Sequence, residues 1–169
     1  MRRLFSIVGW VTLASACSSV DPNERTKVPA PLPAAVFKPV EGAMGAGCAS
    51  LDCHGQPGRN LRLYDARGLR LMSPDVSGLG VTSDAEIIAD EESLLGLEPD
   101  TMALVLHEKG ADPTRLSVVR KARGLEVHKG GVVWPEGSDG DVCLLSWLAS
   151  NIDADACKRA ATKLSTPTM

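Results

Sequence analysis

The chain is poor in aromatic residues and carries no excess of positive charge. Phenylalanine, tryptophan and tyrosine make up 4% of its 169 residues, so a core must rest on leucine, valine, alanine and isoleucine. The formal net charge is -3, which gives no indication of a nucleic-acid partner. No phosphate-binding loop, nucleophile–base pair or pair of catalytic carboxylates stands out in the sequence, so we do not expect an enzyme.

The apolar run over residues 4–16 is too short to span a bilayer comfortably. It follows two arginines and ends in small residues, a pattern typical of an export signal over residues 1–16. Its end at Ser15-Ala16-Cys17 resembles a bacterial lipobox, in which the cysteine is lipidated and becomes the mature N-terminus. The alternative is ordinary cleavage before Cys17, with no lipid.

Residues 17–36 are rich in proline and polar residues and are predicted to form a flexible tether. A lipid followed by such a tether implies a domain held at the cell envelope, facing the periplasm and most simply anchored to the outer membrane. The folded domain is expected over residues 37–164, and the tail over residues 165–169 is expected to fray.

Apolar spacing and capping residues predict a mostly helical domain with long loops. Ser83, with Glu86 three residues later, marks one helix start, and Pro99 marks the start of the next helix. Glycines shortly before Cys48 favour loop character there. The predicted helices occupy residues 34–46, 84–95, 99–109, 113–123, 139–148 and about 154–164.

Cys143 and Cys157 fall in the last two predicted helices, equidistant from a turn near residue 150. Residues so placed in an antiparallel hairpin face each other, and an oxidising compartment would preserve a bridge between them. We therefore predict a Cys143–Cys157 disulfide, with two buried free thiols as the alternative.

The most informative stretch is residues 47–55, Gly-Cys-Ala-Ser-Leu-Asp-Cys-His-Gly. A cysteine pair followed directly by histidine is the attachment pattern of a c-type haem, with the histidine as proximal iron ligand. The usual spacer between the cysteines is two residues, whereas four separate Cys48 from Cys53. On one helix, residues five apart point well away from each other, so Ala49–Asp52 must bulge out if both thiols are to reach one porphyrin edge.

Two other uses of the same residues stay open. Cys48 and Cys53 could instead close a local disulfide, which a four-residue spacer accommodates, leaving His54 as a surface residue. A zinc site is the weakest alternative, because exported thiols tend to oxidise and no fourth ligand stands at a suitable spacing.

The sequence resembles the small haem c domains of exported bacterial cytochromes c. The attachment string Cys48–Gly55 has the Cys-His-Gly ending of that family with a longer spacer. Lys121, the His128-Lys129-Gly130-Gly131 loop and Leu145-Ser146-Trp147-Leu148 are similar to the closing part of such domains, although Lys129 separates the histidine from the glycines. The resemblance covers roughly residues 45–150 and implies a small cytochrome c-like helical domain over residues 37–164.

Three residues are candidates for the distal iron ligand. His128 comes first, because it matches the resemblance and lies beside glycines that allow close approach to a flat cofactor. Met102 is the runner-up and Met72 a third choice, while core packing is the ordinary role of each methionine. His107 is expected on a helix surface.

The combined expectation is a membrane-tethered electron-transfer protein with one covalent haem c, which exchanges electrons with redox partner proteins. The alternative function is a haem-free, disulfide-stabilised lipoprotein domain with a binding or structural role.

Overall fold

A computed structural model describes residues 27–72 and 77–164, with side chains as far as residue 162. The predicted export signal (residues 1–16), the lipidation candidate Cys17 and the predicted tail (residues 165–169) lie outside the described residues. Within the described ranges the chain forms six α-helices and one short 3-10 helix, with a single isolated bridge between Tyr64 and Leu69 in place of strands. The expected mostly helical class is therefore confirmed.

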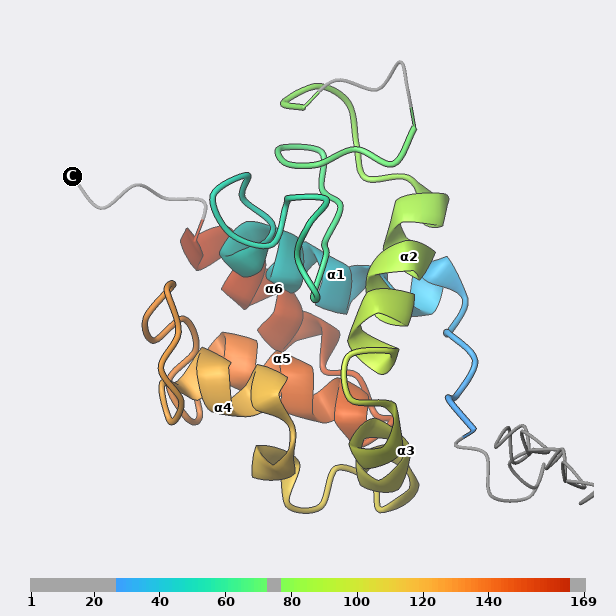
Figure 1. Ribbon diagram of the computed structural model, residues 1–169, viewed down its shortest axis with the longest axis vertical. Helices are drawn as coiled ribbons and strands as arrows, with labels where there is room; N and C mark the ends of the chain where they lie inside the picture. Colours follow the sequence, from blue (N-terminus) through green and yellow to red (C-terminus); the bar gives the residue numbers. More distant parts are fainter. Residues whose placement is uncertain (1–26, 73–76, 165–169) are drawn as a thin grey trace, which may run out of the picture.

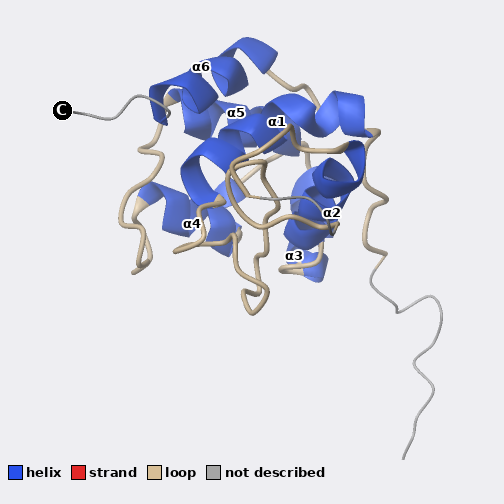
Figure 2. Ribbon diagram, turned by 90° about the horizontal axis from the view of Figure 1, so that it is seen from above, coloured by secondary structure: helices blue, strands red, loops and turns tan. Residues whose placement is uncertain are grey.

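Helix α1 lies in the middle of the domain and packs against α6 on one side and α2 on the other (Figures 1 and 2). Helix α5 packs against α6, while α4 lies on the opposite side of the molecule from α2 and α3 in Figure 2. The elements are α1 (Ala34–Cys48), α2 (Asp84–Leu95), α3 (Pro99–His107), η1 (Pro113–Arg115), α4 (Ser117–Arg123), α5 (Asp139–Leu148) and α6 (Ala154–Leu164).

Helix α1 begins at Ala34, inside the segment that the sequence assigned to the tether. It runs through Pro39 and several glycines to Cys48, where loop character was expected. Proline and glycine weaken an isolated helix, but most helical stability in a protein comes from burying an apolar face. Phe37 is fully buried on that face and packs edge-to-face on Trp147 of α5, with ring centres 5.6 Å apart.

The predicted start of α2 is confirmed in detail. The Ser83 hydroxyl accepts a hydrogen bond from the Glu86 N–H, and the Glu86 carboxylate accepts one from the Ser83 N–H. This reciprocal arrangement satisfies two backbone donors that the first turn of a helix leaves unpaired.

The helix expected over residues 113–123 is divided in the structure. Leu116 has an extended backbone (φ -84°, ψ 130°) and is fully buried, so it separates η1 from α4. The Ser117 N–H then donates to the Glu98 carboxylate at 2.6 Å, which caps the start of α4 from outside the helix.

The last two helices form the predicted hairpin, turning at Ser150 with a φ of 59°. Cys143 of α5 and Cys157 of α6 form a disulfide with their Cα atoms 4.7 Å apart, and both residues are buried. Because α6 also packs on α1, this bridge fastens the C-terminal hairpin beneath the central helix.

Candidate cofactor site

The chain turns sharply where α1 ends at Cys48. The His54 N–H donates to the Cys48 carbonyl oxygen at 3.0 Å. In a regular helix, this oxygen would accept from the residue four positions on. A two-residue spacer would place the histidine at that position, so the structure gives His54 the same bond despite the longer spacer. The residues Ala49–Asp52 loop out, as a four-residue spacer requires if both thiols are to reach one porphyrin edge.

Two glycines hold the looped-out segment in place. The Cys53 and Gly55 N–H groups both donate to the Ser50 carbonyl oxygen, at 2.9 and 3.0 Å. A Cβ atom on either Gly55 or Gly68 would overlap the Ala49 carbonyl oxygen. Since only glycine permits this close approach, the loop geometry depends on both positions.

Cys48 and Cys53 are free thiols in the structure, and each is partly buried. The pKa of the Cys48 thiol is raised to about 12, mainly by burial and in smaller part by the nearby Cys53. The structure therefore does not contain the Cys48–Cys53 disulfide that the sequence left open. Among the described residues, no group of three or more His, Cys, Asp or Glu side chains is placed to hold a metal ion by itself.

His54 is oriented by the loop that follows it. Its Nδ1 atom lies 2.8 Å from the Leu61 carbonyl oxygen, and the Leu63 N–H donates to the His54 carbonyl oxygen at 2.9 Å. Because a carbonyl oxygen only accepts, we assign the ring proton to Nδ1, which leaves the Nε2 lone pair free for a metal. Burial lowers the pKa of His54 against the opposing effect of the Leu61 bond, and this favours the neutral, ligating form.

His128 lies in the loop between α4 and α5. This loop leaves α4 at Gly124, whose φ is +75°. It returns where the Val133 and Trp134 N–H groups both donate to the Ala122 carbonyl oxygen, at 3.0 and 2.9 Å. The His128 ring packs against Gly130, where an added Cβ would lie 2.9 Å from His128 Cε1.

The fold brings His54 and His128 together from distant parts of the sequence. Their ring centres are 5.8 Å apart and their planes differ by 17°. Imidazole nitrogens bind a metal at about 2 Å, so two histidines on opposite sides of one metal have ring centres roughly 6 Å apart. His128 Nδ1 is buried and has no hydrogen-bond partner in the structure. The ring centres of the predicted proximal and first-choice distal ligands are thus about as far apart as those of two histidines on one metal, with the two rings stacked nearly parallel.

Two cavities of different character adjoin the histidine pair. The inner cavity, of about 120 Å³, is mainly apolar, with lining residues that include Met44, Cys48, Leu61, Val118, Val133 and Trp134. The outer one, of about 290 Å³, has lining residues that include Asp52, Cys53, Arg59, Lys121, Val127 and Lys129. Both are lined by His54, His128 and Lys121. An apolar interior beside a polar mouth suits a flat amphipathic group.

The other candidate ligands lie elsewhere. Met102 is 1% exposed within the core and lines neither of these two cavities. Met72 is 60% exposed. His107 is exposed at the end of α3, as the sequence predicted.

The sequence did not identify several residues that shape the site. The Leu61 carbonyl and Gly68 come from the loop after His54, which has no pattern that indicates such roles. Trp134 is 3% exposed, and its ring covers Gly140, where a Cβ would overlap the indole. A glycine in the first turn of a predicted helix was the available signal for this packing.

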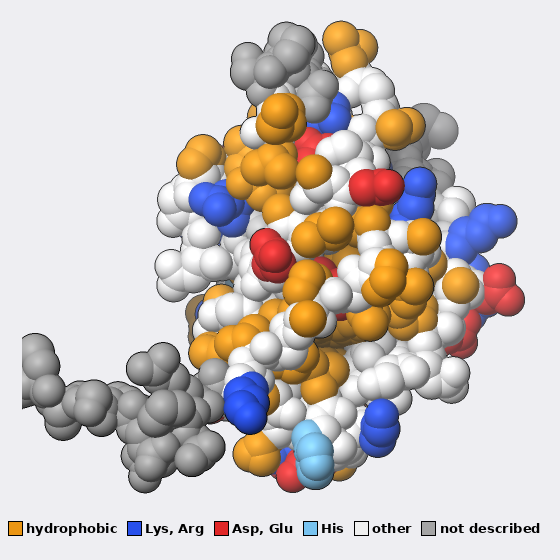
Figure 3. Space-filling view, turned by 90° about the vertical axis from the view of Figure 1, so that its right-hand side faces the viewer, with side chains coloured by type: hydrophobic (Ala, Val, Ile, Leu, Met, Phe, Trp, Pro, Cys, Tyr) orange, Lys and Arg blue, Asp and Glu red, His pale blue; other side chains and the backbone are white. Residues whose placement is uncertain are grey.

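A separate apolar cavity of about 300 Å³ lies on the face shown in Figure 3, where apolar side chains gather with few charges between them. It shares no lining residue with the cavities beside the histidines, and its lining includes Pro29, Leu32, Val36, Leu95, Leu106 and Ile152. Glu91 also lines this cavity, and its carboxylate accepts hydrogen bonds from Trp147 Nε1 at 3.1 Å and from the Leu32 N–H at 2.7 Å.

Comparison of the chain with protein-family models, with curated proteins and with solved structures gave no match. No helix within the described residues is long and apolar enough to cross a membrane. The functional assignment below therefore rests on the geometry of the site together with the attachment motif.

Proposed function

We propose that the protein is a mono-haem c-type electron-transfer protein of the cell envelope, with a small cytochrome c-like helical fold. Cys48 and Cys53 would hold the haem as thioethers, His54 would be the proximal ligand and His128 the distal one. The observation that carries this proposal is the His54–His128 pair, with ring centres 5.8 Å apart, beside two free thiols. When bound, the haem supplies a one-electron iron couple whose potential is low if both ligands are histidine.

The residues around the site have distinct parts in this function. The Leu61 carbonyl fixes the His54 ring and its tautomer. Gly130 allows the backbone of the distal loop to pass close to His128. The apolar lining of the inner cavity excludes water, while the outer cavity keeps Cys53 near the surface, where a partner protein can approach. Nothing in this scheme needs a catalytic residue, and electron exchange by contact is sufficient.

The envelope location rests on the N-terminal sequence. The export signal, lipidation at Cys17 and the Pro-rich segment would anchor the domain to a membrane and face it to the periplasm. The Cys143–Cys157 disulfide supports an oxidising compartment. The exported wild-type chain should be found in the membrane fraction, and the Cys17→Ser variant should be found in the soluble fraction. If both proteins are found in the same fraction, the result argues against a lipid on Cys17.

The decisive test is expression of the full chain with haem-maturation machinery. We expect a Soret band and an intact mass increased by one haem, both absent from a Cys48→Ser/Cys53→Ser variant. A folded wild-type chain without added mass would overturn the proposal and favour the haem-free lipoprotein domain.

The distal ligand is tested on the same material. His128→Ala should convert the low-spin spectrum to a high-spin or ligand-accessible one, because one axial position loses its imidazole. Met102→Leu, which keeps the volume of a buried side chain, should leave the spectrum unchanged. The reverse result would assign the position to Met102.

A further inference from the structure

Four acidic side chains are buried where α1, α2 and the loop between them meet. Glu41 of α1 is 4% exposed, Asp65 of the loop 5%, and Glu86 and Asp90 of α2 are 0% and 1% exposed. Buried carboxyl groups are costly unless they are paired, hydrogen-bonded or protonated. Whether a buried carboxyl group is charged therefore depends on its ionic and hydrogen-bonding partners.

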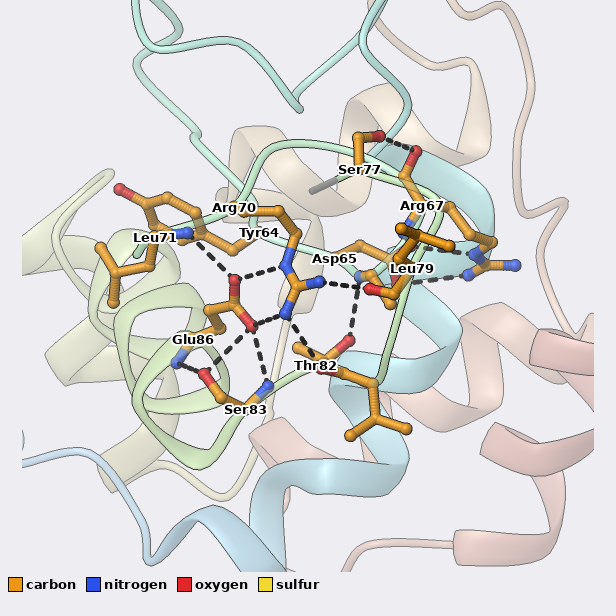
Figure 4. A network of polar contacts seen from close by, with 12 residues as sticks. Tyr64, Asp65, Arg67, Arg70, Leu71, Ser77, Leu79, Thr82, Ser83 and Glu86 are labelled. Atoms are coloured by element: carbon orange, nitrogen blue, oxygen red, sulfur yellow. Dashed lines mark hydrogen bonds and ion pairs between the residues drawn. The ribbon is translucent and has the colours of Figure 1, made fainter. Parts of the chain in front are cut away.

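Two of these carboxylates have arginine partners (Figure 4). Arg70 Nε lies 2.8 Å from Glu86 Oε1, and Arg67 Nε lies 2.9 Å from Asp65 Oδ1. Burial would raise the pKa of Glu86, but hydrogen bonds from Arg70, Ser83 and Leu71 lower it to about 2. Glu86 is consequently ionised, and its charge is held in place.

Glu41 and Asp90 are in a different situation. Glu41 Oε1 is buried without a hydrogen-bond partner, while Asp90 Oδ1 accepts from the Tyr64 N–H at 2.7 Å. The pKa of Glu41 is raised to about 7 and that of Asp90 to about 8, mainly by burial and in smaller part by the neighbouring charges of Asp65 and Glu86. Both groups therefore exchange protons near neutral pH.

The geometry brings Glu41 against Asp65 across a glycine. A Cβ on Gly45 would lie 2.5 Å from Asp65 Oδ2 and 3.2 Å from Glu41 Oε1, so both oxygens sit over the same point of α1. Glycine weakens the interior of a helix, yet another residue would push the two groups apart. The negative charge of Asp65 beside it therefore disfavours ionisation of Glu41 and raises its pKa.

This cluster is connected to the candidate haem site through two parts of the backbone. Glu41 and Cys48 lie on the same helix, about 10 Å apart along its axis. The loop carrying Asp65 also supplies the Leu61 carbonyl to His54 Nδ1 and the Leu63 N–H to the His54 carbonyl. At an effective dielectric constant near 20, a unit charge at about that 10 Å separation changes proton affinity by roughly tenfold or more.

We propose that Glu41 and Asp90, which lie beside the arginine-paired Asp65, form a proton-binding site that is coupled to the redox state of the haem. This inference rests on the proposed function. When a redox partner protein donates one electron to the bound haem, Glu41 or Asp90 would take up one proton from solvent, which would compensate the added negative charge. The groups that face Glu41 and tune this uptake are Asp65, Arg67, Thr82 and Glu86, with Asp90 and Arg70 beside them.

The test is a potentiometric titration of the full haem-loaded chain between about pH 5 and about pH 9. For a tenfold coupling, the reduction potential should fall by about 60 mV as pH rises across this range. Glu41→Gln keeps the shape of the neutral acid and should flatten most of the fall. Glu92→Gln, at an exposed position of α2, is the matched control and should leave the fall intact.

A second readout is the reduced-minus-oxidised infrared spectrum. Reduction near neutral pH should increase a protonated carboxyl C=O band, which Glu41→Gln removes; if that variant does not fold, Asp90→Asn should diminish the band. A pH-independent wild-type potential, or a fall that survives Glu41→Gln, overturns the inference while a normal haem spectrum leaves the proposed function standing. A chain that binds no haem overturns both.

Discussion

The described part of the chain holds two cysteine pairs, and the fold uses them differently. Cys143 and Cys157 face each other from neighbouring helices, are fully buried and form a disulfide. Cys48 and Cys53 are partly buried and free, although fewer residues separate them. Proximity in the sequence therefore does not decide which pair is bridged.

The surroundings explain the difference. The α5–α6 hairpin needs only two helices in register to place its cysteines together. The Cys48–Cys53 segment is built with more constraints, since His54 returns to the Cys48 carbonyl and two obligatory glycines enclose the Ala49 carbonyl. Such a loop positions an imidazole as well as two thiols, which a simple cross-link does not require.

The largest expected effect comes from breaking the loop of the free pair. Gly55→Ala would drive a Cβ into the Ala49 carbonyl oxygen, so the loop must rearrange. We expect a loss of about 3 kcal/mol in the free energy of unfolding, together with much reduced haem attachment. Denaturant unfolding and the intact mass measure the two effects.

Gly58→Ala is the matched control, since nothing lies within 4 Å of a Cβ at that exposed position. It should change stability by less than about 0.5 kcal/mol. Equal behaviour of the two variants would mean that the Ala49 contact does not shape the loop.

Removing the bridged pair should lower the stability of the protein without reducing haem attachment. Cys143→Ser/Cys157→Ser opens a cross-link with a sequence separation of 14, which corresponds to about 3 kcal/mol of stability. Haem attachment should be retained, because neither residue lines the cavities beside His54. Thermal unfolding and the visible spectrum check both statements, and loss of haem with the fold intact would contradict them.

Sequence patterns predicted the elements whose signals are local. The Ser83–Glu86 capping box, Pro99 at the start of α3 and the cysteines of the terminal hairpin each depend on a few neighbouring residues. The end of α1 was less predictable, because the glycines favour loop character before Cys48 while tertiary burial stabilises a helix that runs as far as Cys48.

The residues of the candidate site and its surroundings were likewise predictable only where their sequence signal is local. Cys48, Cys53 and His54 were recognisable from spacing, and His128 from a resemblance in a short loop. The buried carboxyl cluster was not, since Glu41, Asp65 and Asp90 come from three elements and look like ordinary surface residues in the sequence. Their burial depends on how α1, α2 and the loop pack, which a linear pattern does not contain.

A smaller effect should appear in the pH dependence of stability. The Cys143–Cys157 disulfide does not titrate, and burial raises the pKa of the Cys48 thiol to about 12. The folded-state pKa values of Glu41 and Asp90 are raised, so the folded protein binds more protons than the unfolded chain. Stability should therefore fall as pH rises from about 4 to about 8 and then level off.

Glu41→Gln should remove part of that fall, raising stability at about pH 8 by roughly 2 kcal/mol relative to its effect at about pH 4. Chemical denaturation at the two pH values measures this difference. A variant whose stability changes equally at both would show that Glu41 does not titrate in this range.

The smallest expected effect concerns the contact between the two loops of the candidate site. Lys129 Nζ donates to the Asp52 carbonyl oxygen at 3.2 Å, joining the distal histidine loop to the looped-out spacer. These two residues belong to the two places where the sequence departs from the pattern of haem c domains, namely the longer cysteine spacer and the residue inserted between His128 and the glycines. Because this hydrogen bond is exposed, Lys129→Ala should cost only about 0.5 kcal/mol of stability. It should nevertheless let His128 move, which would appear as a small high-spin fraction and faster binding of an added iron ligand such as imidazole. Lys158→Ala, at an exposed position of α6, should do neither. An unchanged ligand-binding rate in Lys129→Ala would show that the two departures do not depend on each other.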